Sequence, residues 1–310
     1  MDFYLGVLQF IGIHTLLGLS AYVLLLTGQV SLAQVGFYAI GAYVSGLLTV
    51  LYSFHILPAL LIGAVVAAIF AFLVGFPTLR VKGLMLVVAT LAFTQFVSLF
   101  FFNLRFQREI EGFLYGPDGP QGFREIRYFN ANGWSLAEVT MFIWAFVIII
   151  MIALWWLDRA RAGAVLRAVG EDELAAQSVG INLTAVKVSA MTAGGFIAGL
   201  AGGLFAHYVT HIQHTTFDVV LATFAVAYPI LGGLSSVFGT LLAVIFIQGG
   251  IIEGLRFTGE WRLFLFGLLL IVTMNLKPDG LLDTRSMHLL RGLFRFSSRD
   301  KRQDKGVVRA

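Results

Sequence analysis

Long apolar runs alternate with short polar connections along most of this 310-residue chain. About 20 apolar residues in a helix suffice to cross the hydrocarbon core of a bilayer, where a helix satisfies its own backbone hydrogen bonds. Because the runs are continuous rather than alternating in polarity, they predict helices and not barrel strands. The nine predicted spans cover about residues 4–27, 32–52, 57–77, 84–104, 136–157, 188–210, 217–235, 237–253 and 262–277.

The predicted spans at 217–235 and 237–253 are the least regular of the set. Both are short, and they adjoin the sequence Gly-Gly-Leu-Ser-Ser at 232–236. Small and turn-forming residues at this place are compatible with two full crossings and with bent helices that pass only half-way through the membrane. Both interpretations stay open.

Composition places the chain among membrane proteins. Hydrophobic residues make up 58% of the chain and charged residues 12%, about half the charged fraction of a soluble domain. We therefore predict an all-α, polytopic transmembrane bundle over residues 1–282. A basic cytoplasmic tail follows at 283–310 and is expected to be attracted to anionic membrane lipid. Cysteine is absent, which excludes disulfides, a thiol nucleophile and thiolate metal ligands.

The distribution of Lys and Arg predicts the orientation. If the connections alternate between the two sides, one side receives fifteen of the 21 basic residues and the other side six. Basic residues concentrate on the cytoplasmic side, so the N-terminus is predicted outside and the C-terminus inside. The polar stretch 158–187 becomes a cytoplasmic loop. The stretch 105–135 becomes an outer loop that is a lid, a docking surface or a plain connector. The net charge of +4 then reflects orientation, and we expect no nucleic-acid partner.

Motifs for enzymatic chemistry are missing from the sequence. No Gly-Lys dipeptide occurs, so the chain has no Walker A loop, and neither HExxH nor GxSxG occurs. No acidic or basic residue lies in the middle of a predicted span, whereas ion-coupled transporters usually need one. A sodium site made of backbone carbonyls stays open, but the missing charges favour a transport subunit that receives its energy from a partner protein. His207, His211 and His214 lie close together near an outer helix end, but without a visible fourth ligand we interpret them as interfacial residues and expect no metal site.

Uncharged polar residues near and within the spans are candidates for a translocation path. They suit a neutral or zwitterionic solute, although such groups also bond neighbouring helices. A second pattern places small residues on one face of the span at 188–210, where another helix of this chain or of a second subunit can approach closely. The small residues are Gly195, Gly199 and Gly203. The candidate path residues are Gln29, Ser31, Gln34, Thr90, Thr94 and Gln95.

Several blocks of the sequence resemble one family of membrane proteins. They lie at residues 28–34, 79–84, 89–93, 163–182, 231–239 and 277–282. Within about 16–282, and in this order, they are similar to the M-type permease subunit of branched-chain amino acid ABC importers. The departures are minor: Asp279 and Ser236 stand where the family commonly has other residues. The sister subunit of these importers and permeases for urea and short amides are similar as well, so the resemblance leaves the solute open.

The resemblance implies a set of partners in the bacterial plasma (inner) membrane. These are a second, H-type permease chain, two cytoplasmic ATPases that bind ATP and Mg²⁺, and a periplasmic or lipid-anchored substrate-binding protein. It implies no cofactor on this chain. ABC permeases carry a short coupling helix with a Glu-x-Ala-Ala pattern and a later Gly, which residues 173–180 match. The residues to which the resemblance assigns ATPase coupling are Arg167, Glu171, Glu173, Ala175, Ala176 and Gly180.

The chemistry of helix ends supports a helix at this place. Asp172 can cap its amino end, and Gly180 can adopt the left-handed conformation that ends a helix. We predict a helix over 171–179, with Ala175 and Ala176 forming a low surface for the ATPase. A self-sufficient channel or facilitator, which would have no use for a coupling helix, and a structural or regulatory membrane subunit are the alternatives.

Overall fold

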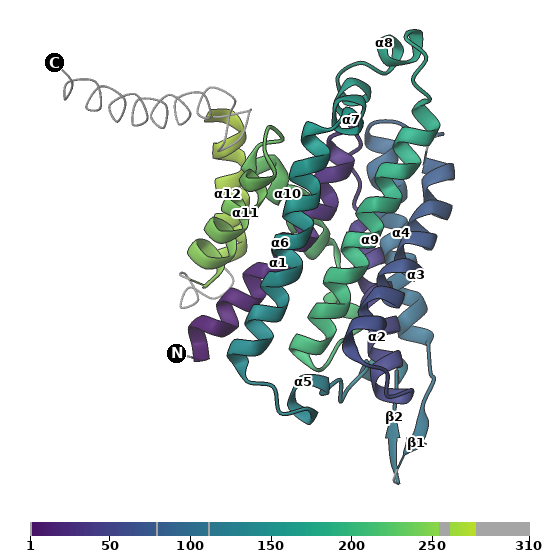
Figure 1. Cartoon of the computed structure of the whole chain (residues 1–310), viewed down its shortest axis with the longest axis vertical. Coiled ribbons are helices and arrows are strands. Elements are labelled where there is room, and N and C mark those ends of the chain that lie inside the picture. Colours follow the sequence, from purple (N-terminus) through teal and green to yellow (C-terminus); the bar gives the residue numbers. More distant parts are fainter. Residues whose placement is uncertain (1, 79, 111, 254–260, 277–310) are drawn as a thin grey trace, which may run out of the picture.

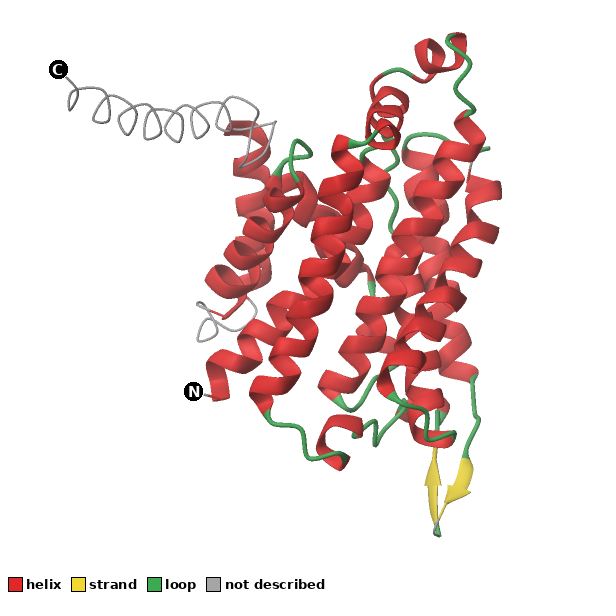
Figure 2. Ribbon diagram, viewed as in Figure 1, coloured by secondary structure: helices red, strands yellow, loops and turns green. Residues whose placement is uncertain are grey.

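Roughly parallel helices make up most of the chain in a computed structural model that describes residues 2–78, 80–110, 112–253 and 261–276 (Figures 1 and 2). The predicted all-α membrane bundle is confirmed. The first six predicted spans correspond to α1 (Asp2–Leu25), α2 (Gln34–Leu51), α3 (Ile56–Thr78), α4 (Leu84–Asn103), α6 (Leu136–Arg159) and α9 (Leu183–Val209).

The C-terminal helices are shorter. The 3₁₀ turn η2 (His214–Thr216) leads into α10 (Val219–Gly232), and α11 (Val237–Val244) continues as the π-helical η3 (Ile245–Glu253) before α12 (Trp261–Leu276). Within the described residues, seven segments are long and apolar enough to cross a membrane, the seventh being 214–232. The segments after α10 are shorter, so the number of full crossings stays a prediction.

The bundle has a central group of helices and an outer group. Most residues of α1, α2 and α9 are buried, whereas fewer than half of those in α3, α4 and α6 are. The outer helices expose large apolar side chains, which suit contact with lipid acyl chains. The protein core therefore lies along α9, with α1 and α2 beside it.

Glycines allow the backbones of neighbouring helices to come into close contact, and these contacts are called glycine seams below. A Cβ atom at Gly202 would overlap the carbonyl oxygen of Tyr38, and a Cβ atom at Gly41 would overlap the backbone of Gly199. The predicted small-residue face of α9, here called the glycine ladder, lies against the same chain: Gly195 contacts α3 near Ala71. Gly199 contacts α3 near Ala67, and Gly203 contacts it near Leu60. The ladder thus packs helices within the chain, and α2, α3 and α9 approach too closely for a solute to pass between them.

The connections gather at two opposite ends of the bundle. Figure 1 shows the N-terminal end of α1 on the same side as the segment between α4 and α6, and α7 and α8 at the other end. This arrangement agrees with alternating connections, and which end faces the cytoplasm stays a prediction from the basic residues. The predicted tail at 283–310 and the block at 277–282 lie outside the described residues.

The segment between α4 and α6, which was predicted to be the outer loop and is called the outer segment from here on, is folded rather than a plain connector. It contains the antiparallel pair β1 (Arg108–Ile110) and β2 (Phe113–Tyr115), the turn η1 (Gly119–Gln121) and the short α5 (Tyr128–Ala131). Phe123 and Ile212 exchange backbone hydrogen bonds of 2.8 and 3.0 Å, which join the segment to the residues after α9. The side chains of Phe123, Ile126 and Phe129 are buried. Burial of these three side chains holds the segment on the end of the bundle.

Candidate functional site

The predicted cytoplasmic loop forms two helices, α7 (Arg161–Glu171) and α8 (Glu173–Ser178). Asp172 separates them because its backbone is extended, so the single helix predicted over 171–179 was too long. Its carboxylate accepts hydrogen bonds from the backbone N–H groups of Leu174 and Ala175 at 2.9 and 3.0 Å. Gly180 has a φ of +86° after the last turn. The predicted N-cap at Asp172 and the predicted left-handed conformation of Gly180 are thus confirmed.

Glu173 ties α8 to the membrane bundle. Its carboxylate lies 2.6 Å from the Lys82 ammonium, which precedes α4, and 2.5 Å from the Lys187 ammonium, in the first turns of α9. The Lys187 side chain is 10% exposed, whereas the Lys82 side chain is 73% exposed. Hydrogen bonds from Lys187 and then Lys82 lower the pKa of Glu173 below its usual value. The carboxylate that we expected to contact an ATPase is therefore engaged within the chain.

A second link holds α7. The Arg167 guanidinium lies 3.1 Å from the carboxylate of Asp158, which in turn accepts a hydrogen bond of 2.8 Å from the Tyr22 hydroxyl in α1. Partial burial is the largest single cause and acts to lower the pKa of Arg167, but Asp158 and Tyr22 together outweigh it, and the pKa is raised. Arg167, like Glu173, faces the bundle. The loop is therefore fastened to the bundle through both of its helices.

The outward surface of α8 differs from the predicted one. Ala176 is only 3% exposed, so the prediction that it contributes to a docking surface is wrong. Residues three apart on a helix share a face, and Ala176 lies on the inward face of α8 with Glu173. The side chains of Leu174 and Val179 are 78% and 76% exposed, and Ala175 is exposed beside them. Two large apolar residues within a charged loop were the sequence signal for this surface.

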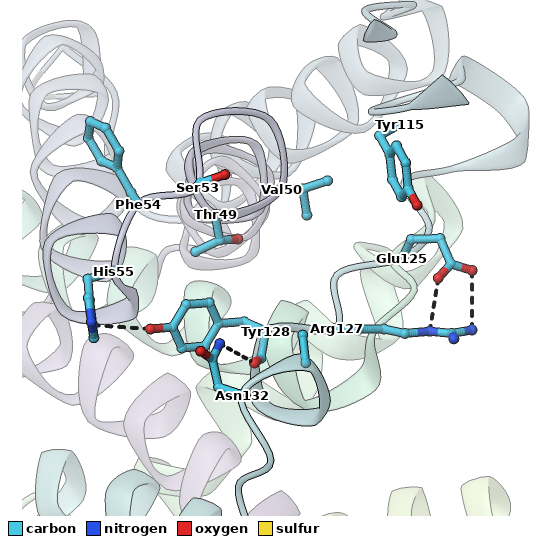
Figure 3. A pocket seen from close by; sticks show the side chains of 11 residues that line it. Thr49, Val50, Ser53, Phe54, His55, Tyr115, Glu125, Arg127, Tyr128 and Asn132 are labelled. Atoms are coloured by element: carbon cyan, nitrogen blue, oxygen red, sulfur yellow. Dashed lines mark hydrogen bonds and ion pairs between the residues drawn. The ribbon is translucent and has the colours of Figure 1, made fainter. Parts of the chain in front are cut away.

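A cavity of about 550 Å³ lies at the opposite end of the bundle (Figure 3). The end of α2, the residues before α3, β2 and the outer segment from 125 to 132 line it. Glu125 and Arg127 form an ion pair of 2.9 Å on one side, and the Tyr128 hydroxyl lies 3.1 Å from Nδ1 of His55 on the other. Three separate stretches of the chain, 49–55, residue 115 and 125–132, build this cavity, so the sequence analysis missed it and used its charges only for orientation.

Thr49 lines the cavity and bonds to the buried His207, which lies outside the lining. The Thr49 hydroxyl lies 3.0 Å from Nε2 of His207 in the last turn of α9. Nδ1 of His207 lies 2.7 Å from the carbonyl oxygen of Gly203 and must carry a hydrogen, because a carbonyl only accepts. His207 is thus satisfied inside the protein. No cluster of three or more metal-ligating side chains occurs in the described part of the chain, and His211 and His214 form no such site with it.

Comparison with known proteins decides the family. A family described as "Branched-chain amino acid transport system / permease component" matches residues 3–274, which is most of the chain. The chain belongs to this permease family. The predicted resemblance is confirmed, and the protein is an ABC-type permease component of the branched-chain amino acid transport class.

The permease is similar to curated proteins that carry different solutes, among them branched-chain amino acids, fructose and autoinducer 2. It is 31% identical over 294 residues to the high-affinity branched-chain amino acid permease LivM of Escherichia coli, and 30% identical to LivM of Salmonella typhimurium; both matches cover 87% of this chain and 68% of the relative. It is 24% identical over 278 residues to the fructose import permease FrcC of Rhizobium meliloti, covering 86% of this chain and 75% of that one. No solved structure matches the permease significantly.

The predicted path residues of the permease surround the connection between α1 and α2. The Thr90 hydroxyl accepts a hydrogen bond of 3.1 Å from the backbone N–H of Leu32, and the Thr94 hydroxyl donates one of 2.8 Å to its carbonyl oxygen. Thr90 and Thr94 lie six and ten residues into α4, so this non-helical backbone is placed roughly 9–15 Å along that helix. Non-helical backbone at such depth needs partners from the protein, and the two threonines supply them.

The remaining predicted path residues are near the same connection. Gln29 is buried 3.2 Å from the Thr27 hydroxyl, and the Ser31 hydroxyl accepts a hydrogen bond from the N–H of Ala33. Gln34 is fully buried, and its side-chain amide has no hydrogen-bond partner among the described residues. Gln95 is partly exposed on α4. None of the six predicted residues lines the outer cavity, so a role in the path stays a prediction.

Proposed function

We propose that this permease is one of two membrane chains of an ATP-driven importer for branched-chain or related neutral amino acids in a bacterial plasma membrane. Its partners are an H-type permease chain, two cytoplasmic ATPases that bind ATP and Mg²⁺, and a periplasmic or lipid-anchored binding protein that delivers the solute. The LivM relatives, which match more closely than the fructose permease, support the amino acid assignment.

The exposed apolar surface of α8 carries the proposal. Leu174 in the capped helix α8 and Val179, the residue directly after it, are exposed at one end of the bundle, beyond the apolar spans. Full burial of one such side chain contributes about 1.5–3 kcal/mol, so a partner groove that covers both gains a useful share of its binding free energy. A self-sufficient channel has no need of such a surface at the end of a polar loop.

The two links of the loop supply a route for coupling. A partner that moves α8 also moves Glu173, whose ion pairs reach Lys82 before α4 and Lys187 in α9. The Asp158–Arg167 pair and Tyr22 connect α7 with α6 and α1 in the same way. Movement of the docked loop is thereby passed to the central helices α1 and α9. Arg167 and Glu173, which were predicted to couple to the ATPase, act in this proposal as the attachment of the loop.

The closed glycine seams support a path shared with a second permease chain. Gly202 and Gly41 bring α2 and α9 into backbone contact, which leaves no passage between these central helices. Glycine seams of this kind are stable packing elements rather than channels. A path along the boundary between two permease chains avoids them.

Co-purification tests the proposal. The permease is co-expressed with its native ATPase and H-type chain, and the complex is purified in mild detergent. Leu174→Glu and Val179→Glu should each reduce the recovered ATPase at least tenfold, because a charge would be buried in the apolar contact. Leu114→Glu is the matched control, since Leu114 is a 66% exposed leucine at the opposite end of the bundle. Recovery of ATPase with both α8 variants at the wild-type level would refute the docking surface.

Uptake into proteoliposomes tests the solute. With the complete importer, binding protein and internal ATP, leucine should accumulate, and it should not accumulate without ATP. Because a fructose permease is among the relatives, fructose and urea serve as alternative solutes. ATP-driven uptake of fructose or urea without leucine would replace the amino acid assignment, and leucine flux through the permease alone would replace the importer assignment by a facilitator.

A further inference from the structure

The cavity at the end of the bundle opposite α8, here called the outer cavity, has no part in the attachment of the coupling loop. Charged side chains line one side of it, and an aromatic ring lines the other. The ion pair of Glu125 and Arg127 lies on one side, the ring of Tyr128 lies on the other, and Val50 lies between them (Figure 3). Its volume of about 550 Å³ falls within the range of small-molecule sites. We propose that this cavity is an entry site for the zwitterionic head and apolar side chain of a free neutral amino acid, an inference that rests on the proposed importer function.

The charged side of the cavity matches a zwitterion. Arg127 uses two nitrogens toward the two carboxylate oxygens of Glu125, at 2.9 and 3.2 Å, so its planar fork is already arranged for a carboxylate. The two side chains are 62% and 46% exposed, and an exposed ion pair of this kind contributes little stability and opens readily. An amino acid replaces both lost partners, its carboxylate pairing with Arg127 and its ammonium with Glu125. A neutral sugar replaces neither charge.

The backbone around the cavity is held in unusual conformations. Ser53, Glu125 and Thr210 are the non-glycine residues with positive φ in the described part of the chain, at +53°, +64° and +63°. Ser53 and Glu125 line the cavity, and the Thr210 carbonyl accepts a 3.0 Å hydrogen bond from Ile126, next to Glu125. Non-glycine residues with positive φ are uncommon, and strained backbone tends to cluster at functional sites. This strain independently points to the cavity as a site.

The rest of the lining favours an apolar side chain on the bound amino acid. Val50 and the ring face of Tyr128 offer apolar contact beyond the ion pair. Thr49, which lines the cavity, already bonds to the buried His207, which is not part of the lining, so Thr49 demands no polar ligand group. The glycine seam below closes this route through the single chain. The solute is therefore held at the outer end, where the exposed charges make binding weak and release easy.

Equilibrium binding tests the site. Full-length permease in nanodiscs is incubated with radiolabelled L-leucine. The competitors are unlabelled leucine, 4-methylpentanoate, which lacks the ammonium, isopentylamine, which lacks the carboxylate, and fructose. Arg127→Gln and Glu125→Gln should each weaken leucine binding at least tenfold. Arg124→Gln, an exposed neighbour that does not line the cavity, should leave binding unchanged. Unlabelled leucine should compete well, and the three other compounds should compete at least tenfold less.

Several outcomes would overturn the inference. They are absence of leucine binding, wild-type binding in both pocket variants, or competition by fructose or by a single-charge analogue equal to that by leucine. Size-exclusion profiles and co-purified ATPase show that the variants fold and assemble. If binding follows the expected pattern while ATP-driven leucine uptake fails, the proposed function falls and the site stands. If uptake succeeds while binding is insensitive to both variants, only the site falls.

Discussion

Replacement of Glu173 by Gln removes the charge that holds α8 between two lysines. The Lys187 ammonium is mostly buried, and a hydrogen bond to a charged group contributes about 1.5–3 kcal/mol. The pair with the exposed Lys82 adds about 0.2–1 kcal/mol. Because Glu173 is itself 29% exposed, we discount the sum to about 2 kcal/mol, which corresponds to a roughly 30-fold change in the local opening equilibrium.

Millisecond hydrogen–deuterium exchange of the permease in nanodiscs measures this opening. The reporters are the amides of Ala176 and Ile181, which donate to the carbonyl oxygens of Asp172 and Ala176. In Glu173→Gln they should exchange roughly 30-fold faster, because the loss of the anchor lets α8 leave the bundle. Glu171→Gln is the matched control, as an exposed glutamate two residues earlier, and should exchange like the wild type.

A double-mutant cycle separates the anchor from a general effect of substitution. Lys187→Met removes the buried charge, so adding Glu173→Gln to it should cost less than Glu173→Gln alone, by roughly 1 kcal/mol or more. Wild-type exchange in Glu173→Gln, or strict additivity with Lys187→Met, would refute the anchor and return Glu173 to a direct role in ATPase contact. Loss of ATPase stimulation with unchanged exchange would lead to the same conclusion.

Three further predictions follow from the same contacts. Because the pKa of Glu173 is lowered, its stabilisation of α8 is complete above the ordinary pKa of about 4.3 and is lost as the pH falls through the lowered pKa. The protection of the α8 amides from hydrogen exchange, corrected for the intrinsic exchange rate, should therefore stay constant from pH 8 to 5 and fall below about pH 4. Asp172→Ala removes the cap of α8 and should destabilise it by about 1 kcal/mol, seen as roughly fivefold faster exchange, whereas Asp172→Asn should retain most protection. Gly202→Val places side-chain atoms on the Tyr38 carbonyl and should lower the thermal midpoint of the detergent-solubilised permease by an amount equivalent to about 1–3 kcal/mol. Gly267→Ala is the control and should leave the midpoint unchanged, because the added Cβ atom meets nothing within 4 Å.

Local chemistry was readable from the sequence wherever neighbours in the chain decide the outcome. Continuous apolar runs predicted the long helices, since burial in hydrocarbon leaves the backbone little alternative. Asp172 and Gly180 predicted the ends of α8, because capping and left-handed backbone depend on a few adjacent residues. The glycine ladder predicted a close helix contact but not its partner, since helical spacing gives a face and not a neighbour.

Tertiary structure alone decided what these elements contact. Glu173 meets Lys82 across 91 residues, and Glu125 faces a cavity that α2 and α5 help to line, so no local pattern could place either. Ala176 turned inward because the ion pairs of Glu173 fix the rotation of α8, which left Leu174 and Val179 on the surface. The sequence by itself determined a membrane permease with a capped loop helix. The packing of distant segments decided which loop side chains hold the protein together and which are left for a partner.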